Sequence, residues 1–192
     1  DPPALGAGSP ARDRSPARNR FHQSGNARLV ARDRGRKGRP RLVASIHRLT
    51  AADLPRLRQF WNEHWDDDFV VTQGTVFNPE NVSGFIALDG NDWVGLITYS
   101  FLETDCEIVS IDSLREGQGI GTELIEKVIE EARANGCHRV HLSTTNDNLR
   151  ALGFYQKRGF QLCALRVNAM EEARKLKPGI PLRDEIELEI ML

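Results

Sequence analysis

Three glycines lie close together in one short segment, at positions 117, 119 and 121, between an apolar strand-like run and an amphipathic helical run. Glycine leaves the main chain bare, so its N–H groups can approach an anion closely, and the dipole of the following helix adds favourable charge. A diphosphate is the ligand that such a turn fits. The spacing matches neither the G-x-G-x-x-G of a Rossmann turn nor the G-x-x-x-x-G-K-[ST] of a P-loop. A flexible turn without a ligand is the alternative interpretation.

A second segment, residues 144–160, reads T-T-N-D-N-L-R-A-L-G-F-Y-Q-K-R-G-F. Its combination with E-G-Q-G-I-G-T at 116–122 closely resembles the GNAT superfamily of acyl-CoA N-acyltransferases. The resemblance extends over residues 42–192, in the order of the elements and in the placement of both motifs. It implies an α/β fold with a mixed, mostly antiparallel central sheet flanked by helices. It also implies that the sheet is splayed between the strands that precede and follow the helix binding coenzyme A.

The resemblance implies an N-acetyltransferase that uses acetyl-CoA as cosubstrate and needs no metal. The acceptor would be a primary amine of a small molecule or protein, attacking directly in a ternary complex. In this superfamily the tyrosine of the second motif often protonates the leaving thiolate, which gives Tyr155 a catalytic role. The implied cofactor-binding residues are Ile111, Asp112, Ser113, Glu116, Gly117, Gln118, Gly119, Ile120, Gly121, Thr122, Asn148 and Tyr155.

Glu116 departs from the superfamily pattern, which usually has Gln or Arg at this position. A carboxylate near a diphosphate is repulsive unless it points away. Arg115 is the candidate for the missing positive charge. We expect Glu116→Arg to tighten acetyl-CoA binding, measured by calorimetry; weaker binding would contradict the placement of the turn.

An amine nucleophile must be neutral, and an alkyl ammonium with a pKa near 10.4 costs about 4 to 5 kcal/mol to deprotonate at pH 7. A carboxylate or histidine should therefore act as general base, directly or through water. Glu107 is the first candidate because it lies on the strand that leads to the glycine turn. Asp112 and His141 are the alternatives, and a structural role remains open for each of the three.

Hydrophobic periodicity and turn residues predict the elements that position these side chains. The helix beginning at Thr50 has Asp53 as a capping-box partner. Residues 66–82 are predicted to be irregular. The predicted strands are 42–46, 84–89, 93–101, 106–114, 140–145, 160–167 and 185–192, and the predicted helices start at 50, 119 and 148. Gly90-Asn91 predicts a hairpin between the second and third of these strands, and the alternation of glutamates with aliphatic residues predicts that the last strand is half-buried.

The charge distribution divides the chain in two. Residues 1–41 hold ten Arg and one Lys against three Asp, a net charge of +8, whereas residues 42–192 hold 15 basic and 24 acidic side chains. The first part is rich in Pro, Gly and Ser and is predicted to be a disordered basic tail. One interpretation is an arm for nucleic acid or an acidic partner, and the other, which we favour, is a solvated leader, a targeting remnant or an over-extended gene model. Residues 42–192 are predicted to form the N-acetyltransferase domain.

Two rival functions remain open at this stage: a non-catalytic acyl-CoA sensor, and a nucleic-acid-associated protein that uses the basic tail. The acidic run 66–68 would suit a cationic acceptor, and residues 175–181 are expected to border its site. No apolar run is long enough to span a membrane and no signal peptide is visible. Three isolated cysteines favour a cytoplasmic location. The oligomeric state is left open, and a homodimer is one of the open alternatives.

Overall fold

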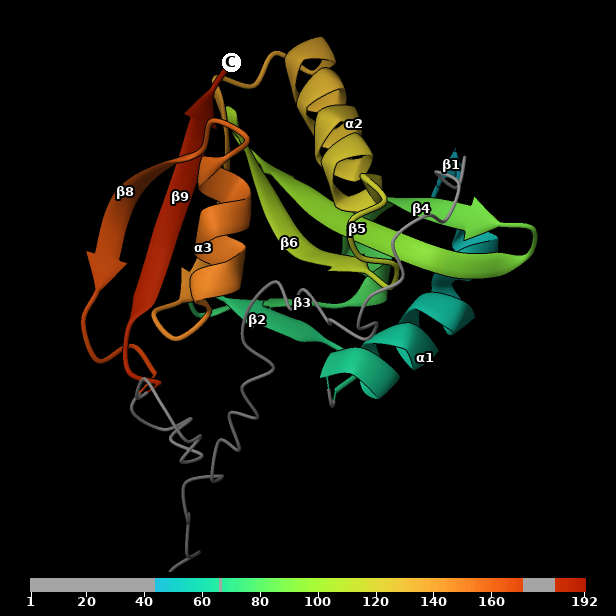
Figure 1. Ribbon diagram of the computed structural model, residues 1–192, viewed down its shortest axis with the longest axis horizontal. Helices are drawn as coiled ribbons and strands as arrows, with labels where there is room; N and C mark the ends of the chain where they lie inside the picture. The colour runs from blue at the N-terminus through green and yellow to red at the C-terminus, as the bar shows by residue number, and fades with distance from the viewer. Residues whose placement is uncertain (1–43, 66, 171–181) are drawn as a thin grey trace, which may run out of the picture.

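The computed structural model describes residues 44–65, 67–170 and 182–192 (Figure 1). Its strands are β1 (Ser45–Arg48), β2 (Val70–Thr72), β3 (Thr75–Phe77), β4 (Ser83–Asp89), β5 (Asp92–Leu102), β6 (Asp105–Ser113), β7 (Arg139–Thr145), β8 (Gln161–Arg166) and β9 (Glu185–Met191). Seven of them form one sheet in the order β1-β4-β5-β6-β7-β9-β8, while β2 and β3 form a separate two-stranded sheet. All pairs in the main sheet are antiparallel except β6 with β7. The mixed, mostly antiparallel sheet is therefore as predicted.

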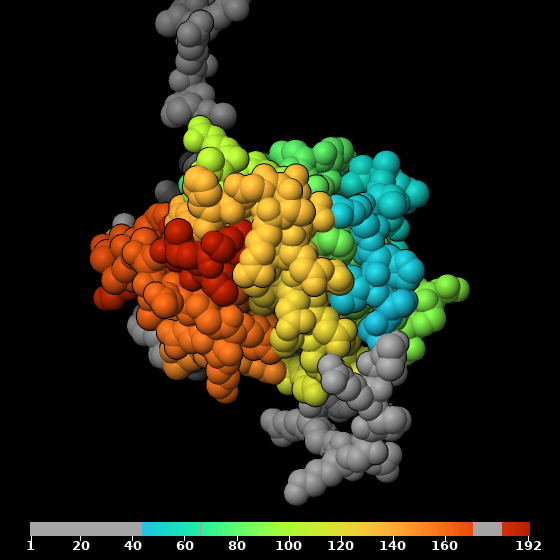
Figure 2. Space-filling view, turned by 90° about the horizontal axis from the view of Figure 1, so that it is seen from above, coloured from blue at the N-terminus to red at the C-terminus, as the bar shows by residue number. Residues whose placement is uncertain are grey.

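The helices are α1 (Leu54–Trp65), α2 (Ile120–Ala134) and α3 (Leu149–Gln156), with the short 3₁₀ turns η1 (Ala51–Asp53) and η2 (Pro79–Asn81). Helices α2 and α3 pack on one face of the sheet, and α1 packs with β2 and β3 on the other. Viewed from above, α2 lies at the surface between the amino-terminal elements and β8–β9 (Figure 2).

Helix α2 forms because its apolar residues recur on one face. Leu124, Ile125, Val128 and Ala132 are buried against the sheet, as the 3.6-residue period requires. Gly119 precedes the helix in a left-handed conformation, with φ of +87°, which only glycine adopts without strain. The predicted helix thus agrees with the structure to within one residue.

Two cores hold the sheet between its layers. The core under α2 and α3 contains the apolar residues of β5, β6 and β7 that face those helices, together with Tyr155. The core on the opposite face is smaller and contains Trp61 and Trp65 of α1, Val70 and Phe77 of the small sheet, and Val109 of β6. Each fully buried large side chain contributes about 1.5–3 kcal/mol of transfer free energy, so both faces of β6 are firmly held.

The main sheet is splayed between β6 and β7. These strands pair only from Asp105–Arg139 to Ile108–Leu142, although β6 continues to Ser113 and β7 to Thr145. In Figure 1, α3 lies between the diverging β6 and β9. Beyond Ile108, no strand in the described part of the chain pairs with the β7-facing edge of β6. The predicted splay is therefore present, and it leaves the edge of β6 along residues 109–113 without a partner strand on the β7 side.

Two segments differ in secondary structure from the sequence-based expectation. Residues 66–82 were predicted to be irregular, but the described part contains the β2–β3 hairpin and η2. The prediction failed because each strand has only three residues, too few to display a period. The first strand begins at Ser45, and part of the predicted range 42–46 lies outside the described residues.

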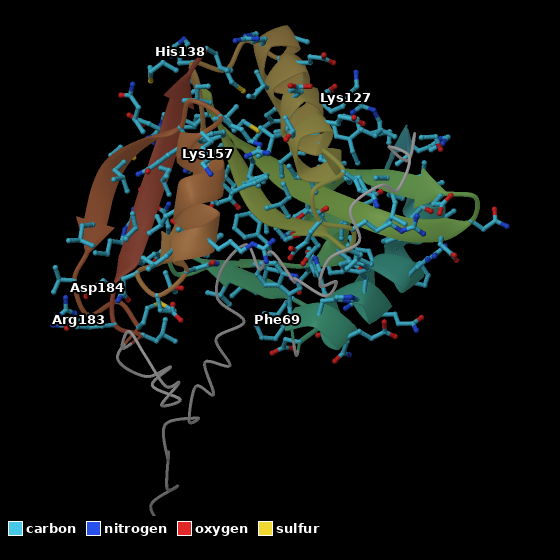
Figure 3. All side chains as sticks on the ribbon, viewed as in Figure 1. Phe69, Lys127, His138, Lys157, Arg183 and Asp184 are labelled. Atoms are coloured by element: carbon cyan, nitrogen blue, oxygen red, sulfur yellow. The ribbon has the colours of Figure 1, made fainter. Side chains whose placement is uncertain are left out.

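Strand β9 was predicted to be half-buried, because its glutamates and aliphatic residues alternate. Glu185 and Glu187 are instead buried together with Leu188. The reason is ion pairing: Arg166 of β8 lies 2.6 Å from Glu187 and 3.9 Å from Glu185. Arg183 and Asp184, an ion pair of 2.6 Å, precede the strand (Figure 3).

Candidate active site

The glycine turn is conformationally specialised. Gly117 and Gly119 have φ of +71° and +87°, in the region where a side chain is strained. Gly121 serves a different purpose, because a Cβ there would lie 3.0 Å from Cζ of Phe154 in α3. Two glycines therefore shape the turn, and the third allows α2 to approach α3 closely.

A pocket of about 310 Å³ opens between this turn and α3. Its volume and its bare main-chain lining fit a diphosphate group at the amino end of α2. Seven predicted cofactor-binding residues line it: Ser113, Glu116, Gly117, Gly119, Ile120, Gly121 and Thr122. The turn and the second motif, which are separate in sequence, are therefore brought together as predicted.

The other predicted cofactor-binding residues do not line this pocket. Asn148 caps α3, and its Oδ1 accepts a hydrogen bond of 3.2 Å from the main-chain N–H of Ala151. Ile111 is part of the core under α2. Asp112 points to the opposite face, where its Oδ2 accepts a hydrogen bond of 3.0 Å from Nε1 of Trp65. Gln118 and Tyr155 also lie outside the pocket lining.

The charges around the turn differ from the expectation for Arg115. Its Nη1 lies 2.6 Å from Oδ2 of Asp89, so this guanidinium already has a partner. Glu116 instead forms an ion pair with Arg150 of α3. Arg150, which the sequence analysis did not consider, thus neutralises the carboxylate at the unusual motif position. The effect of Glu116→Arg on acetyl-CoA binding stays a prediction.

Glu107 lies one residue before the last β6–β7 pair. Its side chain is buried, with 3% exposed, and its Oε1 accepts a hydrogen bond of 2.8 Å from Oγ1 of Thr72. Burial raises the pKa of Glu107 to about 7, with Glu185 and Glu187 adding to this effect. A carboxylate whose pKa is close to neutral has the properties of a general base.

His141, one of the alternative bases, is directly opposite Glu107 on β7. Burial, followed by the charge of Arg139, lowers the pKa of His141. The imidazole is therefore neutral at pH 7, and its Nδ1 lies 3.7 Å from Oε1 of Glu187. This position connects His141 to the buried glutamates of β9.

Tyr155 of α3 is completely buried, with its ring edge-on to Phe154 and Phe160. Its hydroxyl group has no hydrogen-bond partner within the described ranges. Burial, and then the charge of Asp112, raises the pKa of Tyr155. The phenol therefore remains protonated at physiological pH, and its O–H is a donor without a partner among the described residues.

Three residues of the second motif line the pocket although they were not predicted to do so: Arg150, Phe154 and Arg158. They are spaced four residues apart, which places Arg150 and Phe154 on one face of α3. This spacing, applied to the predicted helix starting at residue 148, was the signal that could have found them.

Of the acidic run expected near the acceptor, residue 66 lies outside the described residues, and all of residues 175–181 lie outside them. Asp68 is paired with Arg58 at 2.6 Å, so it is not a free charge for an acceptor. Among the described residues, no group of acidic, histidine and cysteine side chains is arranged to hold a metal ion. No described helix combines the length and apolar character of a membrane span.

Comparison with known proteins gives concordant results. The model of the acetyltransferase (GNAT) family matches residues 44–160. The uncharacterized protein YxbD of Bacillus subtilis is 49% identical over 124 residues, covering 64% of this chain and 78% of that protein. A GNAT family acetyltransferase from Elizabethkingia anophelis, solved with acetyl-CoA bound, has a TM-score of 0.59 at 24% identity, covering 78% of this chain and 98% of that one. A B. subtilis acetyltransferase in complex with CoA has a TM-score of 0.59 at 21% identity, with coverages of 78% and 99%.

Proposed function

Because the chain belongs to the GNAT acetyltransferase family, we propose that it transfers an acetyl group from acetyl-CoA to a primary amine of a small molecule or protein. Use of acetyl-CoA as the acyl donor follows from the family. The preference for a nitrogen acceptor rests on one observation: the buried carboxylate of Glu107, with a pKa of about 7, at the point where β6 and β7 separate.

The cosubstrate is held along two neighbouring surfaces. The main-chain N–H groups of 117–122 bind its diphosphate in the pocket between α2 and α3. The open edge of β6, residues 109–113, provides main-chain groups that pair with the pantetheine arm. This arm then directs the thioester toward the base of the splay.

Glu107 removes a proton from the acceptor ammonium, directly or through one water. A base with a pKa near 7 is half ionised at neutral pH. A large fraction of Glu107 is then in the basic form, and this form is a stronger base than an ordinary carboxylate. The neutral nitrogen then attacks the thioester carbon in the ternary complex, without a covalent enzyme intermediate.

The carbonyl oxygen gains negative charge during the attack and needs a donor close by. A bulge in β6 supports this role, because Val109 has no partner between the pairs Tyr99–Ile108 and Thr98–Ser110. A bulged residue leaves the hydrogen-bonded ladder. Main-chain groups of Val109 are therefore available two residues after Glu107.

Tyr155 donates to the sulfur as the carbon–sulfur bond breaks. The nitrogen loses a second proton when the amide forms, and this proton balances the one that the thiolate takes up. The raised pKa of Tyr155 limits its strength as an acid, so we expect a modest contribution to the rate.

The test is a thiol-release assay with acetyl-CoA and a broad panel of amines. An amine-dependent release of coenzyme A, with stoichiometric formation of the acetylated amine, supports the proposal. Binding of acetyl-CoA without release from any amine would instead favour a sensor. Salt-sensitive binding of nucleic acid that is lost on deleting residues 1–41 would favour the second rival.

A further inference from the structure

Three arginines line the pocket at the glycine turn, and they differ in their partners. Arg115 is paired with Asp89, and Arg150 is paired with Glu116. Arg158, which follows α3, forms no ion pair with any residue that the structure describes. It is therefore the lining arginine whose charge is not already balanced by a contacting carboxylate.

The Arg158 side chain is fixed in one orientation. Its Nε donates to Oγ1 of Thr122 at 2.9 Å, its Nη2 donates to the same oxygen, and its Nη1 donates to the carbonyl of Phe154 at 2.6 Å. The guanidinium also lies over the Phe154 ring, 3.5 Å from its centroid. A guanidinium has five N–H donors, so two donors remain for a ligand.

The surroundings of this cation are electrostatically unfavourable without an anion. Thr122 belongs to the first turn of α2, where the helix dipole is positive. Burial lowers the pKa of Arg158, as expected for a cation without a close counter-charge. A fixed arginine fork beside the positive end of a helix is well suited to bind phosphate oxygens.

We propose that Arg158, held by Thr122 and Phe154, is a direct ligand of the acetyl-CoA diphosphate in the pocket at the amino end of α2. This inference rests on the proposed function. The diphosphate is favoured over the 3′-phosphate because Arg158 lines the same pocket as the main-chain groups of 117–122.

Calorimetry of the full chain with acetyl-CoA tests the assignment. We expect Arg158→Met to weaken binding by roughly 10- to 100-fold, the usual range for hydrogen bonds to charged groups. Arg158→Lys should recover part of this loss, because it keeps the charge but not the fork. Lys157→Met is the matched control: it removes the same charge from the adjacent exposed residue (Figure 3) and should change the dissociation constant less than twofold.

A second titration with 3′-dephospho-acetyl-CoA separates the phosphate groups. If Arg158→Met lowers the affinity for both cosubstrates equally, Arg158 binds the diphosphate. If the affinity falls only for acetyl-CoA, the assignment is overturned and Arg158 binds the 3′-phosphate. An effect no larger than that of Lys157→Met also overturns the assignment. If the unmodified chain binds neither cosubstrate, the proposed function itself fails. If the unmodified chain binds both but Arg158→Met shows no specific loss, only the assignment of Arg158 fails.

A purely structural clamp between α2 and α3 predicts a different result. It would lower the melting temperature and affect kcat and KM together. A phosphate ligand instead raises KM for acetyl-CoA with little change in kcat, and it weakens the salt dependence of binding in Arg158→Met but not in Arg158→Lys. Loss of melting temperature without the KM effect would contradict the proposal.

Discussion

At the scale of single residues, Glu107 lowers the stability of the fold at neutral pH, and its proposed role as general base explains why such a residue is present. Its pKa lies at about 7 in the folded chain, against an ordinary value of 4.5. The folded state therefore binds this proton more tightly than the unfolded state does. The contribution of protonated Glu107 to the free energy of unfolding is fully present below about pH 4.5 and is lost as the pH rises through 7. A buried carboxylate that destabilises the fold at neutral pH is typical of a functional site.

Glu107→Gln should separate stability from activity. At pH 8 we expect the variant to unfold with a free energy roughly 2–3 kcal/mol larger than that of the unmodified chain, and this gain should vanish near pH 4.5. Its kcat should fall by roughly 100-fold or more, and the rise of kcat/KM with pH around 7 should disappear. Denaturant titrations and pH–rate profiles measure both. Glu103→Gln, exposed in the β5–β6 turn, is the control and should leave both quantities unchanged. An unaltered pH profile in Glu107→Gln would exclude Glu107 as the base.

Tyr155→Phe removes a buried hydroxyl group that has no partner among the described residues. We expect the melting temperature to stay the same or rise, because an unsatisfied buried polar group is unfavourable. Turnover with a saturating amine should fall by roughly tenfold. Turnover that is unchanged from pH 6 to 9 would remove Tyr155 from the mechanism.

At the scale of elements, the sequence predicted the long periodic segments well. Residues 119–134 show a helical period that α2 follows, and Gly90-Asn91 indicated the β4–β5 hairpin correctly. The short β2–β3 hairpin was missed because three-residue strands have no period. The pairing of Glu116 with Arg150 and the position of Arg158 depend on how α3 packs against α2, and no local pattern encodes that contact.

Gly95 and Gly153 provide a matched test of the packing between layers. A Cβ at Gly95 would lie 2.5 Å from Cγ2 of Ile120 and 3.2 Å from the carbonyl of Asp112. We expect Gly95→Ala to destabilise the fold by roughly 1–3 kcal/mol, because α2 must move away from β5. Gly153→Ala, in α3, meets nothing within 4 Å and should stabilise by roughly 0.5–1 kcal/mol. Thermal unfolding compares the two; equal effects would contradict the close approach of α2 to the sheet.

At the scale of the whole molecule, the charge contrast between residues 1–41 and the rest of the chain supports our proposal that 42–192 is the functional domain. Deletion of residues 1–41 should leave the melting temperature within about 2 °C and acetyl-CoA affinity within about twofold, if the separate domain 42–192 that the sequence predicts folds and binds on its own. Differential scanning calorimetry and isothermal titration provide the check. A large loss of affinity would show that the basic segment contributes to cosubstrate binding.

The short pairing between β6 and β7, where the main sheet splays, has a consequence for folding cooperativity. In the described part of the chain, β6 and β7 share only four paired positions. We therefore expect the carboxyl-terminal strands and α3 to open as a separate unit at a lower free energy than global unfolding. A cosubstrate that contacts both sides of the splay would make the carboxyl-terminal strands open less often on their own. Slower amide hydrogen exchange throughout β7 and β9 would then accompany acetyl-CoA binding, far beyond the residues that touch it.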